Sequence, residues 1–205
     1  MARWTAKEIV LNIASSKEAI IFLETVQKQI KNADIFADYY PGKITIRFEG
    51  AKENLQDAIE KTKQFHKFVS EMLYPDNEGY YSFDLQFLTK VTGKSVPLKT
   101  LLRILNLKNY EAIREEEKIH AKCDFNVISE IITRLDEALS SMPYEVSTSS
   151  LRDVLATIMI TNNIEIEKAI AEAQKKKIIS KDDLDRLILS MEPEQALEKC
   201  LKITK

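Results

Sequence analysis

Apolar and polar residues alternate along several short stretches of the chain, as they do in β-strands with one buried face. The clearest of these stretches in the first third of the chain are residues 9–13, 34–40 and 43–49. Two longer stretches repeat apolar residues at helical spacing instead, residues 15–32 and 52–73. Ser15 and Glu18 fit a capping box, and Pro41-Gly42 suits a tight turn between strands. The pattern predicts the order strand, helix, strand, strand, helix.

The same order recurs about 75 positions later in the chain. Residues 118–124 alternate like residues 43–49, and both stretches place basic residues at the ends of the polar face, Lys118 and Lys122 matching Lys43 and Arg47. The repeat predicts two tandem β-α-β-β-α units over residues 1–75 and 76–145. Each would pack two helices on one face of a three-stranded antiparallel sheet, an α+β arrangement of the ferredoxin-like kind.

One segment of the second copy has two interpretations. Alternation predicts a strand from Phe83, Leu85 and Phe87. The spacing of Leu85, Leu88 and Thr92 fits a helix equally well, and periodicity cannot distinguish a strand from a helix over so short a stretch. Beyond it, Ser95 and Pro97 resemble the cap and first turn of a helix. A hairpin over residues 110–124 and a helix ending before Pro143 complete the copy.

The last part of the chain, residues 146–205, is predicted to form a separate and mostly helical C-terminal module. Ser180 and Asp183 have the spacing of a helix start. Residues 186–191 could instead form a short strand of a winged-helix unit, and both interpretations stay open. A final helix is expected from Pro193.

The stretch Ser95-Val96-Pro97-Leu98, continued by residues 105–112 and then by the hairpin and helix, resembles an archaeal family of about this length that is known as a domain of unknown function. The resemblance covers nearly the full chain. It implies an archaeal cytoplasmic protein and provides no catalytic residues to transfer.

The composition is that of an ordinary globular protein. Of its 205 residues, 44% are hydrophobic and 30% charged, and only four are glycine, which excludes disordered and collagen-like classes. The longest apolar runs are far shorter than the roughly 20 residues of a membrane span, so a cytoplasmic protein is expected. Cys123 and Cys200 lack paired spacing, which favours two buried thiols over a disulfide or a zinc site.

Acid–base or nucleophilic catalysis is not indicated. The chain has only two histidines: His66 lies among apolar residues of a predicted helix, and His120 lies on the polar side of a predicted strand. The acidic run 115–117 belongs to a hairpin tip, and no glycine-rich phosphate loop exists. A non-enzymatic protein without cofactor or metal is predicted.

Two features indicate nucleic-acid binding. First, residues 85–110 contain five basic and no acidic residues, a local charge of plus 5. Lys99 and Arg103 share one helix face, where like charges repel unless an anion such as phosphate lies between them. If residues 85–92 are helical, this segment resembles a helix-turn-helix, although Thr92, Lys94 and Lys99 replace residues that are usually apolar there.

Second, the duplicated basic strands would direct cations away from the helices, on the face with which ferredoxin-like sheets often bind RNA. Trp4, Phe36 and Tyr40 could supply stacking, although the consensus of RNA-recognition motifs is missing. The competing interpretation is that strand lysines prevent edge aggregation and that the aromatic residues pack structurally. RNA is favoured over DNA because the sheet-face signal is duplicated. The predicted nucleic-acid-binding residues are Lys43, Arg47, Lys90, Lys94, Lys99, Arg103, Lys118 and Lys122.

The alternative function is a protein–protein adaptor or assembly factor, because the helical C-terminal module would offer amphipathic surfaces to a partner protein. Composition does not decide between the two, since the net charge of minus 2 still allows a local basic surface.

Overall fold

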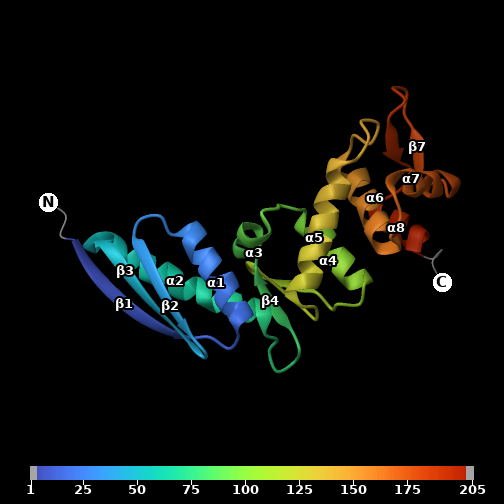
Figure 1. Ribbon diagram of the computed structural model, residues 1–205. Helices are drawn as coiled ribbons and strands as arrows, with labels where there is room; N and C mark the ends of the chain where they lie inside the picture. The colour runs from blue at the N-terminus through green and yellow to red at the C-terminus, as the bar shows by residue number, and fades with distance from the viewer. Residues whose placement is uncertain (1–3, 202–205) are drawn as a thin grey trace. The chain divides into compact units, whose positions relative to one another are not determined.

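The computed structural model describes residues 4–201 and is a mixed α/β protein (Figure 1). Over these residues it contains eight helices and three small sheets, with about 52% helix and 22% strand. Contacts divide the chain into two compact units. The first holds the chain up to Val91 together with Glu117–Ile119, and the second holds Thr92–Glu116 and the residues from His120 on.

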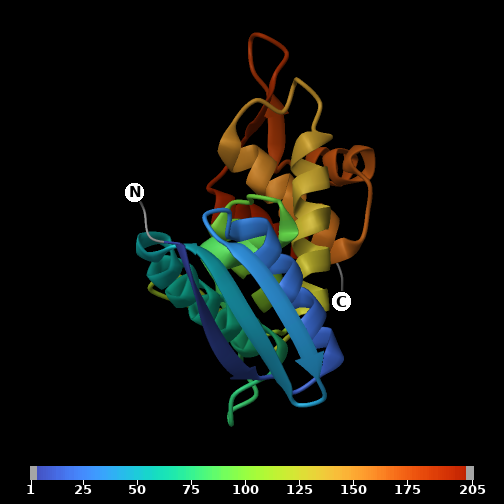
Figure 2. The same ribbon diagram turned by 60° about the vertical axis from the view of Figure 1, so that its left-hand side comes forward.

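The first unit is built on an antiparallel sheet of β1 (Trp4–Asn12), β2 (Asp34–Tyr40) and β3 (Lys43–Ala51) in the order β1-β3-β2. Both helices that follow strands, α1 (Ser16–Gln29) and α2 (Lys52–Leu73), lie on one side of this sheet (Figure 2). The predicted order strand, helix, strand, strand, helix is confirmed over residues 4–73. The opposite side of the sheet carries no helix of the unit (Figure 2).

The alternation in β3 explains which side is covered. Ile44, Ile46 and Phe48 are fully buried toward the helices, while Lys43 and Arg47, which have the opposite alternation, are exposed. The capping box also forms as predicted: Ser15 Oγ accepts a hydrogen bond from the amide of Glu18, and Glu18 Oε2 accepts one from the amide of Ala14 at 2.8 Å.

The ambiguous segment resolves into a short strand β4 (Tyr81–Asp84) followed by a helix α3 (Leu85–Thr92). Of the two interpretations left open, the helical one is correct for residues 85–92, and the strand ends at Asp84. Asp84 Oδ1 accepts a 2.8 Å hydrogen bond from the amide of Phe87, which fixes the first turn of the helix. Phe87 and Leu88 are then both buried on one side of it.

A second three-stranded sheet has the order β4-β6-β5, with β5 (Ile113–Glu115) and β6 (Lys118–Ala121) forming the predicted hairpin. The helix α4 (Leu98–Leu107) begins one residue after Pro97, which occupies its N-cap without a side-chain hydrogen bond. The predicted cap at Ser95 is wrong, because Ser95 lies two residues before the true cap position and is out of reach of the first helical amides.

The second unit is mainly helical, and its remaining helices are α5 (Phe125–Ser140), α6 (Ser149–Asn162), α7 (Ile166–Lys175) and α8 (Pro193–Leu201). The helix α6 packs against α4, α5, α7 and α8. It is buried on nearly every side, with all residues from Val154 to Ile160 buried. It therefore forms the centre of this unit's core. No helix in the described part of the chain is long and apolar enough to cross a membrane.

Of the two interpretations left open for this segment, the strand is found and the helix start at Ser180 is not, because β7 (Ile179–Lys181) and β8 (Leu187–Leu189) form an antiparallel hairpin. Asp182 organises the turn instead: its Oδ1 accepts hydrogen bonds from the amides of Leu184 and Arg186, both at 2.9 Å. The predicted division into ranges 1–75, 76–145 and 146–205 stays a prediction about separately folding pieces.

Candidate nucleic-acid interface

The side of the first sheet away from α1 and α2, here called the open face, brings together residues from all three strands. Residues directly opposite in an antiparallel register share a face. Lys43 lies opposite both Asn12 and Tyr40, and Arg47 lies opposite both Glu8 and Phe36. Because Lys43 and Arg47 point away from the helices, these two rows belong to the open face.

Exposed aromatic rings and cations are paired on the open face. Phe36 and Tyr40 of β2 are 49% and 56% exposed. The Arg47 guanidinium carbon lies 5.0 Å from the centre of the Phe36 ring, and Lys43 Nζ lies 5.8 Å from that of Tyr40. On β1, Trp4 lies on the same side of the sheet and is 67% exposed. The three aromatic residues named from the sequence therefore lie on one face.

The open face also carries carboxylates that the sequence interpretation overlooked, Glu8, Asp34, Asp38 and Glu49. The signal was present, because Asp34 and Asp38 alternate with the two aromatic residues of β2. Two cations against four carboxylates give the face a formal charge of minus 2. Arg47 also lies 3.2 Å from Glu49. A broad phosphate-attracting patch is thus absent from this face, and its acceptors suit amino groups of bases better.

Most of the other predicted cations have carboxylate partners within the chain. The distances from cation nitrogen to carboxylate oxygen are 2.8 Å for Lys94 and Asp136, 2.7 Å for Lys118 and Glu71, 2.6 Å for Lys122 and Glu111, and 3.2 and 3.0 Å for Lys99 and Arg103 to Glu194. Lys90 instead lies over the ring of Phe65 at 5.8 Å. The structure does not gather the eight predicted cations on one surface, and only Lys43 and Arg47 share the open face.

The two helices of the helix-turn-helix interpretation fall in different compact units. The helix α3 belongs to the first compact unit and α4 to the second. The like charges of Lys99 and Arg103 are already paired with the carboxylate of Glu194. The pKa of Glu194 is lowered chiefly by the hydrogen bond from Lys99. Phosphate is therefore not needed to relieve the repulsion between Lys99 and Arg103.

The histidines have structural surroundings. His66 Nε2 lies 2.8 Å from the carbonyl oxygen of Asn12, and its ring meets Phe22 edge-on at 5.5 Å. His120 lies 3.7 Å from a carboxylate oxygen of Glu115. Among the described residues, no cluster of three histidine, cysteine or acidic side chains has the arrangement of a metal site.

The two cysteines are free and buried. Burial, with a smaller contribution from the charge of Asp124, raises the pKa of the Cys123 thiol from 9.0 to about 12. Because the thiolate is the nucleophilic form, Cys123 is unreactive at neutral pH.

This raised pKa predicts a loss of stability at alkaline pH. Below pH 9 the thiol is protonated in both folded and unfolded chains, so it has no effect on the free energy of unfolding. Between pH 9 and about 12 only the unfolded chain ionises, which lowers that free energy as the pH rises. Urea denaturation at pH 8 and pH 10 should show a smaller decrease for Cys123→Ala than for the wild type. Equal decreases would contradict the assignment.

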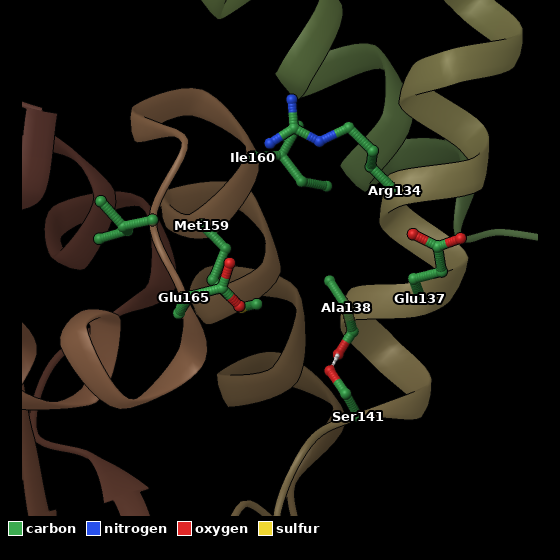
Figure 3. Close-up of a pocket in the computed structure, with 8 residues that line it drawn as sticks. Arg134, Glu137, Ala138, Ser141, Met159, Ile160 and Glu165 are labelled. Atoms are coloured by element: carbon green, nitrogen blue, oxygen red, sulfur yellow. Dashed lines mark hydrogen bonds between the residues drawn. The ribbon is translucent and has the colours of Figure 1, made fainter.

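A separate hollow of about 210 Å³ lies between α5 and α6 in the second unit (Figure 3). Its lining combines the apolar side chains Ala138, Met159, Ile160 and Ile164 with the charged side chains Arg134, Glu137 and Glu165. Asn163 has a left-handed φ of 52° at the end of α6, and its Oδ1 accepts a 2.5 Å hydrogen bond from Arg134. Two carboxylates against one guanidinium make this hollow unsuitable for a polyanion.

Comparison with known proteins identifies one family. A family model described as "Uncharacterized protein conserved in archaea (DUF2067)" matches residues 11–198. No curated protein and no solved structure matches the chain. Because the match spans nearly the whole sequence, the resemblance seen around residues 95–112 is confirmed.

Proposed function

Given that the chain belongs to this archaeal family, we propose that it binds single-stranded nucleic acid on the open face of its first sheet, with RNA ahead of DNA. The observation that carries the proposal is the pair of exposed rings on β2, Phe36 and Tyr40, each with a cation of β3 over it. Such an arrangement offers a stacking surface to a base and a positive charge to its phosphate.

Stacking supplies the main part of the proposed affinity. A base stacked on an exposed aromatic side chain contributes roughly 1–3 kcal/mol, and every base can do so. Phe36 and Tyr40 are four residues apart on one strand, a separation of about 13 Å, so they would receive different bases of one strand. RNA is favoured because the carboxylates of the open face can accept hydrogen bonds from 2′-hydroxyl groups, which DNA lacks.

The salt dependence tests this proposal. With only Lys43 and Arg47 available to neutralise phosphates, the slope of log affinity against log salt should be about −1.4, from −0.7 for each of two contacts on a single strand. Fluorescence anisotropy of a labelled uridine oligomer across a salt series measures it. A slope several times steeper would place binding on another, more basic surface, and absence of binding at low salt would refute the proposal.

We also propose that the first two thirds of the chain contain an internal duplication and that its last part forms a winged-helix-like module. An internal duplication is supported by the strand order, which runs first, third, second in both β1-β3-β2 and β4-β6-β5. The second copy has an additional helix, α3, so its order departs from β-α-β-β-α.

A winged-helix-like module is supported by the β7–β8 hairpin that follows α7 and by the bridge between Val146 and Leu187. Two free cysteines fit the proposed cytoplasmic location.

The adaptor function is the second candidate, and two loop residues of the second unit favour it. Tyr144 is 91% exposed and Leu184 at the hairpin tip is 70% exposed. Large apolar side chains that protrude singly from loops can insert into a partner's pocket. This candidate becomes the leading one if single-stranded RNA and DNA both fail to bind.

A further inference from the structure

A pocket of about 250 Å³ opens at the end of the first sheet, where β1 begins and β3 ends. Its polar and aromatic lining consists of Trp4, Lys31, Asn32, Asp34, Glu49 and Asn54. Trp4, Asp34 and Glu49 have the parity of the open face, so the pocket continues that face at its edge. The proposed stacking surface therefore ends in a hollow with its own chemistry.

We propose that this pocket binds one nucleobase through hydrogen-bond donors on its Watson–Crick edge, guanine in preference to the others. The inference rests on the proposed function, because it assigns base selectivity to the strand that lies on the open face. Trp4 would stack on the base, and the carboxylates of Asp34 and Glu49 would accept its donors.

The two carboxylates are unusually placed for a structural role. Asp34 and Glu49 lie directly opposite each other on neighbouring strands, an arrangement in which like charges repel. Arg47 lies 3.2 Å from Oε1 of Glu49 and offsets part of this repulsion. A ligand that donates hydrogen bonds to both carboxylates would relieve the remainder.

The chemistry of the bases selects guanine. Its Watson–Crick edge carries two adjacent donors, the N1 imino and the N2 amino groups, which match carboxylate acceptors. Adenine and cytosine each present one amino donor beside an acceptor nitrogen, and uracil presents one imino donor between two carbonyl oxygens. Acidic side chains accept from base amino groups in the same way elsewhere in nucleic-acid recognition.

The remaining lining residues suit the rest of a nucleotide. Lys31 provides a cation at the pocket, and its Nζ is held by the carbonyl oxygen of Gln27 at 2.9 Å. Asn32 donates to Asp57 at 3.2 Å through one of its two amide hydrogens, so the amides of Asn32 and Asn54 each offer a neutral donor for a guanine carbonyl oxygen. Lys31 would then meet a phosphate of an oligomer whose guanine occupies the pocket, a third contact that the uridine oligomer of the salt series does not make.

The test uses the full chain and four uridine heptamers with G, A, C or U at the central position. Trp4 is the only tryptophan of the chain, so its fluorescence reports stacking in the pocket directly. We expect the G oligomer to bind about 10- to 100-fold more tightly than the other three and to quench this fluorescence most strongly.

The variants Asp34→Asn and Glu49→Gln should abolish the preference for G while binding of the all-uridine heptamer persists. Asp38→Asn is the matched control, since Asp38 lies four residues from Asp34 on the open face but outside the pocket lining. It should leave the preference unchanged.

Two failures can be told apart. Equal binding of all four oligomers would overturn the guanine pocket and leave the proposed function standing. If no oligomer binds, the proposed function fails, and guanosine monophosphate alone then decides the pocket. Quenching of Trp4 by this nucleotide that is lost in Asp34→Asn would support a nucleobase site, and absence of quenching would overturn it.

Discussion

Replacing Phe36 and Tyr40 together by alanine is expected to weaken the binding of single-stranded RNA by about 30-fold or more. Each ring is exposed on the open face and would stack on one base, and losing two such contacts removes at least about 2 kcal/mol. Folding should be little affected, because neither side chain is part of the buried core. Anisotropy titrations at fixed salt measure the affinity, and thermal denaturation checks the fold.

The matched control is Tyr39→Ala. Tyr39 lies between Phe36 and Tyr40 on the same strand and is 42% exposed, but its parity places it on the opposite side of the sheet. Its loss should leave RNA affinity unchanged. If the double variant binds as tightly as the wild type, or if Tyr39→Ala weakens binding equally, the open face is not the interface.

Leu155→Asp is expected to unfold the second unit. Leu155 is fully buried on α6, the helix that packs against four others, so the new carboxylate would be buried without a partner. Such a burial costs several kcal/mol, a large part of the roughly 5–15 kcal/mol that stabilises a typical domain. Hydrogen exchange followed by mass spectrometry should show lost protection throughout α4, α5 and α6.

Leu184→Asp makes the same chemical change at a position that is 70% exposed, and it should leave exchange rates unchanged. Retained protection of α6 in Leu155→Asp would contradict its central position. The prediction also bears on the adaptor function: deleting residues 147–205 removes α6 and exposes the core of α4 and α5, so loss of a partner after that deletion would not identify a docking surface. Substitution of Tyr144 or Leu184 is the more informative change.

The local sequence determined residues 4–73 of the first unit almost completely. Its signals act within a few residues: the alternation in β3, the capping box of Ser15 and Glu18, and the Pro41-Gly42 turn. The long helix α2 begins and ends where its apolar spacing predicted, Lys52–Leu73. Even the aromatic residues of the open face could be named from the sequence, since alternation along β2 places Phe36 and Tyr40 together.

Short segments with balanced propensities were decided by tertiary structure. Residues 85–92 fit a strand and a helix equally until Asp84 caps the first turn and Phe87 and Leu88 are buried together. The hairpin of β7 and β8 replaces a helix start at Ser180 because the side chain of Asp182 stabilises a turn. The nearly uniform burial of α6 also depends on helices from other parts of the chain.

The charge distribution shows the limit of sequence reasoning most clearly. Five basic residues without a nearby acid predicted a phosphate-binding segment, but three of them, Lys94, Lys99 and Arg103, have carboxylate partners at distant positions. Glu194 lies 95 residues from Lys99, and Asp136 lies 42 residues from Lys94. Alternation reports which face a side chain occupies, because that follows from local backbone geometry. Which cations stay available to a ligand depends on contacts between distant elements, and only the folded chain decides these.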